Sequence, residues 1–151
     1  MPSFSQIART ADEMGLNRGF LGSDEAYQWV RELQRRNLIV PLVGNFAGPQ
    51  TLRNVGRWLG ERGATVSAFY CSNVEQYLFQ SDEWVRFYRN VATLPLDSTS
   101  TFIRSVTSRM RFVGPQSGNM MSQLTSPMTG LVKDVVNGQV QSYMDVIVRS
   151  N

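Results

Sequence analysis

Two short polar turns carry the residue types that could do chemistry in this chain, and each follows an apolar run. The first is Gly44-Asn45-Phe46-Ala47-Gly48 and the second is Ser72-Asn73-Val74-Glu75. Turns between a strand and a helix are where open α/β sheets bind ligands, because the first amides of each helix are unpaired there. The sequence therefore predicts one shared ligand site, formed by Gly44, Asn45, Phe46, Gly48, Ser72, Asn73 and Glu75.

Each of these turns also has a purely structural interpretation. The Asn45 amide could hydrogen-bond a polar ligand group while the Phe46 ring stacks on it, but Asn45 also suits a tight turn and Phe46 a core. Helix N-terminal amides beyond Ser72 and Asn73 could hold phosphate or carboxylate. Alternatively, Ser72 and Glu75 have the spacing of a capping box, in which both side chains satisfy backbone amides.

Tyr70 and Tyr77 flank the second turn in the sequence, and Asp97 and Arg104 could line the same edge of the sheet. Tyr70 and Tyr77 are expected to pack in the core, because aromatic side chains bury large areas. Asp97 is expected in a polar turn, and Arg104 is expected to be a solvated cation.

The composition excludes several kinds of catalysis. The chain has no histidine and a single cysteine, Cys71, so Ser-His and Cys-His pairs and cysteine-based zinc sites are absent. No clustered carboxylates predict a metal site, and no catalytic residue is assigned.

All but one of the fifteen cations are arginine, a residue suited to phosphate and carboxylate. Arg31, Arg35 and Arg36 form one group, and a second contains Arg104, Arg109 and Arg111. Neither group is interleaved with an aromatic binding motif, which favours solvated faces and disfavours nucleic acid as a partner.

A length of 151 residues predicts one α/β domain over residues 1–151, with residues 1–22 as an N-terminal arm. The longest apolar run, 38–43, is far shorter than the ~20 residues that span a bilayer. The first residues lack the features of a signal peptide, so we expect no membrane partner and a cytoplasmic location.

Hydrophobic periodicity predicts the elements that position the two turns. Helices are expected over 24–36, from Pro49 to Gly63, from 72 through 79, over 82–90 and over 120–135 with a break at Pro127 or Gly130. Strands are expected over 38–43, 65–70, 101–106 and 140–148, with 91–96 extended and 107–118 a loop. Because 38–43 is apolar at nearly every position, it is predicted to be a parallel strand covered on both faces.

These elements predict an α/β three-layer sandwich whose sheet is mostly parallel and Rossmann-like but only partial, with an antiparallel strand at the C-terminus. A partial sheet leaves an edge that invites pairing with another chain. We therefore expect a homodimer or a separately encoded partner that supplies the N-terminal half of the fold.

Several segments together resemble a known family over nearly the whole chain. They are Asn37-Leu-Ile-Val-Pro-Leu-Val-Gly-Asn-Phe-Ala-Gly-Pro49, Gly63-Ala-Thr-Val-Ser-Ala-Phe-Tyr70, Ser72-Asn-Val-Glu-Gln-Tyr-Leu-Phe79, Ala92-Thr-Leu-Pro-Leu-Asp97 and Ser100-Thr-Phe-Ile-Arg-Ser105. They look like the C-terminal half of a largely uncharacterised bacterial family that resembles class I S-adenosylmethionine-dependent methyltransferases. The resemblance implies that 38–43 is the fourth strand of such a sheet and suggests S-adenosylmethionine as a cofactor. The glycine-rich first turn that would bind it is absent from this sequence.

Three classes of function remain open at this point. The chain could be a methyltransferase-like component of an enzyme that handles S-adenosylmethionine or a nucleotide. It could instead bind a small molecule or anion without catalysis, or be an interaction domain that completes a partner's sheet.

Overall fold

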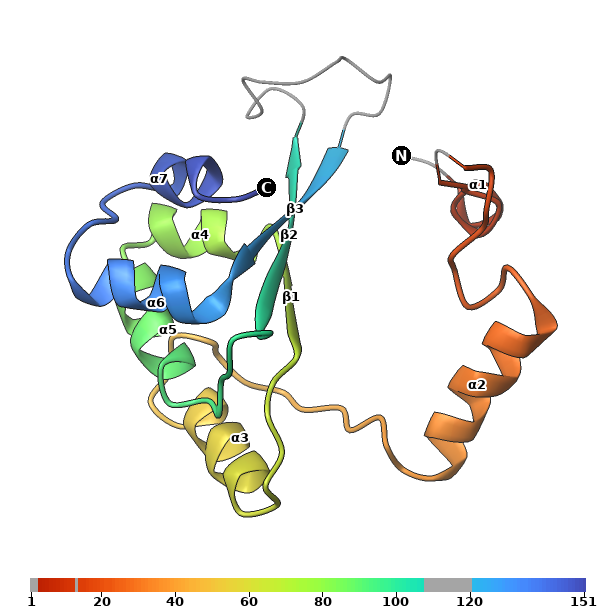
Figure 1. Ribbon diagram of the computed structural model, residues 1–151, viewed down its shortest axis with the longest axis horizontal. Helices are drawn as coiled ribbons and strands as arrows, with labels where there is room; N and C mark the ends of the chain where they lie inside the picture. Colours follow the sequence, from red (N-terminus) through yellow and green to blue (C-terminus); the bar gives the residue numbers. More distant parts are fainter. Residues whose placement is uncertain (1–2, 13, 108–120) are drawn as a thin grey trace. The chain divides into compact units, whose positions relative to one another are not determined.

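The computed structural model describes residues 3–12, 14–107 and 121–151, and the chain divides into two compact units, Met1–Val43 and Gly44–Asn151 (Figure 1). The expected arm of residues 1–22 belongs to the first unit, which also contains the helix that follows it. Arg109, Arg111 and the predicted loop beyond Thr107 lie outside the described residues. Across those residues, no helix combines the length and apolarity that a membrane span requires.

The first unit contains two helices, α1 (Phe4–Ala8) and α2 (Asp24–Arg35). Ser23 is the N-cap of α2, and its hydroxyl accepts a hydrogen bond from the Ala26 amide at 3.1 Å. This confirms the predicted start of the helix, because a serine at this position satisfies an amide that has no partner within the helix. Asn17 links the preceding loop to α1, donating from its side chain to the Ala8 carbonyl at 2.6 Å.

The segment 38–43 forms no strand in the structure, so the prediction of a central parallel strand is wrong. Its apolar side chains are exposed, with Val40 61% and Leu42 65% accessible to solvent. An apolar run becomes a buried strand only where neighbouring strands offer backbone partners, and none of the described strands pairs with this segment.

The second unit has a mixed three-stranded sheet in the order β1-β2-β3. Its strands are β1 (Ala68–Ser72), β2 (Thr101–Thr107) and β3 (Met121–Pro127). β1 pairs parallel with β2, placing Tyr70 beside Ile103, and β2 pairs antiparallel with β3, placing Ile103 beside Thr125. The α/β class is therefore confirmed, but the sheet is mixed rather than mostly parallel, and its antiparallel strand is β3 rather than the predicted C-terminal strand over 140–148.

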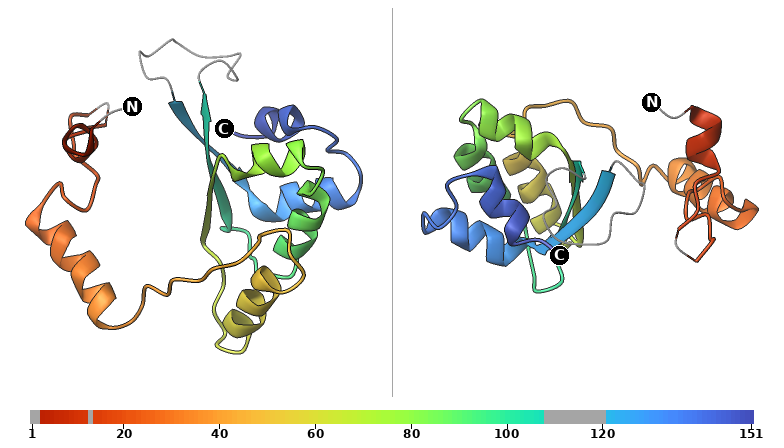
Figure 2. Two further views of the ribbon diagram at one scale, coloured as in Figure 1. Left: turned by 180° about the vertical axis from the view of Figure 1, so that it is seen from behind. Right: turned by 90° about the horizontal axis from the view of Figure 1, so that it is seen from above.

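Five helices accompany this sheet: α3 (Thr51–Gly60), α4 (Val74–Gln80), α5 (Trp84–Val91), α6 (Met128–Val136) and α7 (Tyr143–Val148). Figures 1 and 2 show all five on the same face of the sheet, so the described part of this unit has two layers. The second helical layer of the predicted sandwich is not seen among the described residues.

Helix α3 follows its prediction apart from its first residues. It begins at Thr51 rather than at Pro49, buries Leu52 and Gly56, and is followed by Gly63 with a φ of 61°, which ends it as predicted.

Two predictions in the C-terminal third are wrong in part or in full. The predicted helix over 120–135 is strand β3 as far as Pro127, and only its second half is helical, as α6. β3 alternates exposed Gln123 and Thr125 with buried Leu124 and Ser126, the period of a half-buried strand.

The predicted strand 140–148 is instead helix α7. Ser142 and Asp145 form a capping box there, since the Ser142 hydroxyl accepts from the Asp145 amide and the Asp145 carboxylate accepts from the Ser142 amide. This box favours a helix start over a strand. The expected extended segment 91–96 begins inside α5 and continues as a turn.

The main core of the second unit lies between the sheet and its helices. Phe69, Phe87 and Phe102 pack there edge to face or tilted, with ring centroids about 6 Å apart. Phe46 joins this cluster, 5.9 Å from Phe69. Aromatic packing thereby fixes the loop 44–48 against the sheet.

Candidate functional site

The first predicted ligand turn is held by hydrogen bonds within its own unit. The Asn45 side chain accepts from the Ala47 amide at 2.9 Å, and Asn90 donates to the carbonyls of Phe46 and Gly48. A Cβ on Gly44 would collide with the side chain of Thr51. Asn45 thus makes the turn contact, and Phe46 the core contact, that their structural interpretation predicts.

The second predicted turn does not contain the capping box proposed for it. Ser72 is the last residue of β1 with a φ of 51°, and Asn73 precedes α4 without a side-chain cap. Glu75 is fully buried and turned toward the sheet instead of back toward the helix start. The capping interpretation of Ser72 and Glu75 is therefore wrong, because an internal cation captures the carboxylate.

The two turns keep separate partners in the structure. The loop 44–48 bonds to its own backbone and to Asn90, whereas Glu75 bonds to side chains of α5 and β2. Since 38–43 is not a strand, the first turn does not follow a strand end. Ligand binding by the seven predicted residues stays a prediction.

A fully buried ion pair forms the polar centre of the second unit. Arg104 of β2 donates from Nε to Glu75 Oε2 at 2.6 Å and from Nη2 to Glu75 Oε1 at 3.1 Å. Its Nη1 donates to Ser126 at 2.7 Å and to Ser150 at 3.0 Å, while the Tyr88 hydroxyl donates to Glu75 at 2.5 Å. The prediction of a solvated Arg104 is wrong.

This network uses the hydrogen-bonding groups that a substrate would need. Both Glu75 oxygens and all three guanidinium nitrogens of Arg104 are engaged by the protein. Burial and the neighbouring Glu75 carboxylate raise the pKa of Tyr88 well above its ordinary value, so this phenol stays protonated. The cluster therefore joins α4, α5, β2 and β3 structurally, and offers no free group for catalysis.

Cys71, at the end of β1, is also buried beside this network. Burial raises the pKa of its thiol, which keeps it neutral and poorly nucleophilic. In the described ranges, no three metal-ligating side chains are grouped to hold an ion.

The face of the sheet opposite the helices carries a small polar and aromatic surface. The Tyr70 hydroxyl lies 3.1 Å from Ser105 Oγ, which accepts from Gln123 Nε2 at 2.8 Å. Tyr70 is 59% exposed, and hydrogen bonds to Ser105 and then Ser72 lower its pKa. The prediction that Tyr70 and Tyr77 pack in the core is wrong, because both residues are 59% exposed.

The two outer edges of the sheet differ. On β3, Thr125 exchanges backbone hydrogen bonds with Asn151, at 2.9 and 2.8 Å, and this partly closes that edge. On β1, the Ser67 carbonyl accepts from Thr101, so Ser67 and Phe69 direct their backbone groups toward β2. Because successive strand residues alternate, Ala68 and Tyr70 direct theirs away from the sheet. No described strand pairs with them there.

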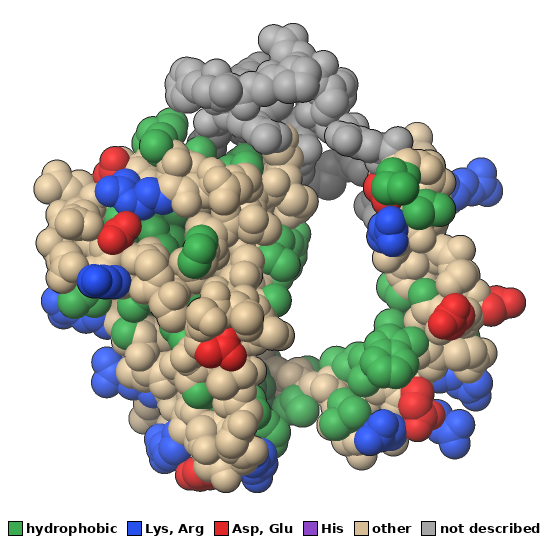
Figure 3. Space-filling model, in the orientation of Figure 1, with side chains coloured by type: hydrophobic (Ala, Val, Ile, Leu, Met, Phe, Trp, Pro, Cys, Tyr) green, Lys and Arg blue, Asp and Glu red, His purple; other side chains and the backbone are tan. Residues whose placement is uncertain are grey.

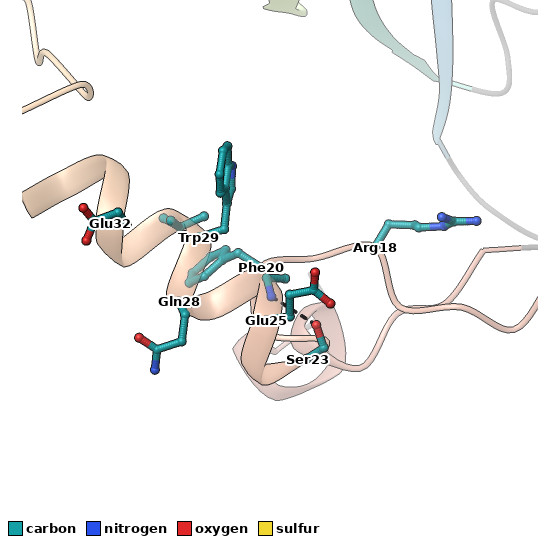
Figure 4. A pocket seen from close by; sticks show the side chains of 9 residues that line it. Arg18, Phe20, Ser23, Glu25, Gln28, Trp29 and Glu32 are labelled. Carbon is teal, nitrogen blue, oxygen red and sulfur yellow. Dashed lines mark hydrogen bonds between the residues drawn. The ribbon is translucent and has the colours of Figure 1, made fainter. Parts of the chain in front are cut away.

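Apolar surface is also concentrated in the first unit (Figure 3). An open hollow of about 670 Å³ runs along α2, lined by Arg18, Phe20, Ser23, Glu25, Ala26, Gln28, Trp29, Val30 and Glu32. Figure 4 shows Trp29 extending to one side of the helix and Gln28 to the other. Ser23 is engaged as the N-cap and Arg18 pairs with Asp12 at 2.9 Å, so polar groups do not converge on one point.

Within the described residues, the second unit is a two-layer α/β domain whose edge strand β1 pairs on one side only. The chain belongs to the family described as Domain of unknown function (DUF7790), which it matches over residues 3–146. No curated protein matches it.

Sequence reasoning missed the buried pair and the unpaired edge for different reasons. Phe102, Arg104 and Val106 alternate along β2 and share its buried face, a pattern that could have placed Arg104 in the core. The sequence of an edge strand carries no comparable local signal of which segment pairs with it.

Proposed function

We propose that this chain is an interaction domain whose sheet is completed by an added strand from a partner. The observation that carries the proposal is the outer edge of β1, where Ala68 and Tyr70 present backbone groups that no described strand pairs. Such an edge is a template for β-strand addition, in which main-chain hydrogen bonds supply affinity.

The surface around this edge supports strand addition. The adjoining face carries Tyr70 and the partly exposed Ile103, so an added strand gains side-chain contacts as well as backbone bonds. The opposite edge is partly closed by Asn151, which leaves β1 as the better acceptor.

Hydrogen exchange at single amides tests this proposal. The probe strand is a synthetic peptide of residues 35–45, which contains the exposed apolar segment 38–43. Its arginines aid solubility. We expect it to slow exchange at Ala68 and Tyr70, whereas Thr125, already paired with Asn151, serves as the internal reference. Fast exchange at Ala68 and Tyr70 under every condition, including excess peptide, would contradict the proposal.

The methyltransferase-like function remains a prediction from the sequence resemblance. The parallel pair β1 and β2, joined through α4 and α5, is compatible with part of a Rossmann-like sheet. A three-layer form would need further helices on the uncovered face.

A further inference from the structure

The segment Leu38-Ile39-Val40-Pro41-Leu42-Val43 has the properties of a strand without a partner. It belongs to no helix or strand, and five of its six side chains are large, apolar and exposed. Six extended residues span about 20 Å, which is enough to cover the five residues of β1. Burying a valine or leucine side chain stabilises by about 1.5–3 kcal/mol, so this segment gains from any contact that covers it.

Pro41 determines which side of the segment can pair. A proline has no amide hydrogen and is tolerated in a strand only where its nitrogen faces away from the neighbour. Because backbone groups alternate, Ile39, Pro41 and Val43 would face outward. Leu38, Val40 and Leu42 would then pair with the acceptor strand.

The outer edge of β1, which would accept this strand, has backbone groups that alternate in the same way. Ala68 and Tyr70 of β1 direct their amides and carbonyls outward, two residues apart, which is also the separation of Val40 and Leu42. Beyond Tyr70 the register of β1 is irregular, so pairing would end near Ser72.

We propose that the strand completing the sheet is residues 38–43 of a second copy of this chain. The inference rests on the proposed function and names its partner. In the part of the chain that the structure describes, each copy carries an unpaired acceptor edge and an exposed donor segment, so two copies satisfy both reciprocally through a two-fold exchange. The added strand presents Pro41 on its outer side, which blocks a further strand and closes the assembly as a dimer.

Two proline substitutions in the same segment provide the test. Leu42→Pro removes an amide on the pairing side, whereas Val43→Pro removes one on the outer side. Neither residue lies in a helix or strand, so both variants should keep the circular dichroism of the unchanged chain. By light scattering over a concentration series, we expect dimers for the unchanged chain and Val43→Pro, and at least a tenfold weaker dimer for Leu42→Pro.

Amide exchange at Ala68 and Tyr70, measured on the same samples, separates the two proposals. Protection that appears with dimer formation supports both. A monomer whose amides become protected only when the 35–45 peptide is added overturns the second copy, while completion by a partner strand stands. A monomer whose amides are protected without peptide overturns both proposals, because the chain then covers its own edge. A dimer that both proline variants preserve equally overturns the second copy as the donor of residues 38–43. A monomer whose amides stay unprotected even with excess 35–45 peptide overturns both.

Discussion

Arg104 is the residue on which the polar core depends. It binds Glu75 through two nitrogens and Ser126 and Ser150 through the third, and both members of the ion pair are fully buried. Removing one member of a buried pair leaves the other charge without compensation, which costs more than the pair itself contributes.

Arg104→Ala is therefore expected to destabilise the second unit by about 3–5 kcal/mol, because Glu75 loses its counter-ion in a buried site. The control is Arg86→Ala, which breaks the solvent-exposed bridge to Glu83 and should change stability by less than about 1 kcal/mol. Urea denaturation followed by circular dichroism measures both. Equal effects of the two substitutions would show that the buried pair has no special role.

Tyr143 makes the free energy of unfolding depend on pH in the alkaline range. Burial, followed by the nearby Glu75 charge, raises the pKa of Tyr143 to about 12 from its ordinary value of 10.0. Its stabilising contribution is fully present below the unfolded pKa and is lost as pH rises between these values, because only the unfolded state ionises readily. Tyr143→Phe should flatten the decline in the free energy of unfolding between about pH 10 and 12. An unchanged decline in urea titrations would exclude this group as the cause.

At the scale of elements, the close packing of α3 depends on one glycine. A Cβ at Gly56 would lie 2.6 Å from the Thr93 carbonyl oxygen, just after α5, whereas a Cβ at Gly60 in the same helix meets nothing within 4 Å. The backbone of the turn after α5 cannot move aside as a flexible side chain could.

Gly56→Ala should therefore lower the free energy of unfolding, since α3 must shift away from α5. Gly60→Ala is the matched control, because it offers the same gain in helix propensity without the collision. It should be neutral or stabilising by up to about 1 kcal/mol. Thermal melts compare the two variants, and a stabilised Gly56→Ala would show that the packing is looser than the structure indicates.

At the scale of the whole molecule, the unpaired edge and the exposed segment decide the expected behaviour in solution. Val40→Asp would abolish folding if 38–43 were a central strand, since a buried unpaired charge is not tolerated. With Val40 exposed, we expect the variant to fold with unchanged circular dichroism. An insoluble or unfolded Val40→Asp variant would support the prediction that 38–43 is a central strand.

The cofactor prediction also belongs to this scale. The resemblance suggests S-adenosylmethionine, but the glycine-rich turn that would hold it is absent from the sequence. Isothermal calorimetry should therefore detect no micromolar or tighter binding to this chain. Tight binding would favour the methyltransferase-like function over the interaction domain.

Local signals in the sequence determined the elements that depend on neighbouring residues. The expected helix over 24–36 matches α2, which Ser23 caps, and the expected strand over 101–106 matches β2, because caps and periodicity act over a few residues. The capping box of Ser142 and Asp145 is an equally local signal, and it contradicts the strand expected over 140–148.

Only the tertiary structure decided which segments have partners. It placed Arg104 against Glu75, 29 residues away, and turned Glu75 from a predicted cap into a buried counter-ion. It also left 38–43 exposed despite its strand-like composition. The apolar side chains of a segment indicate that burial would stabilise it. The surface that buries the segment, however, belongs to residues distant in sequence or to another chain.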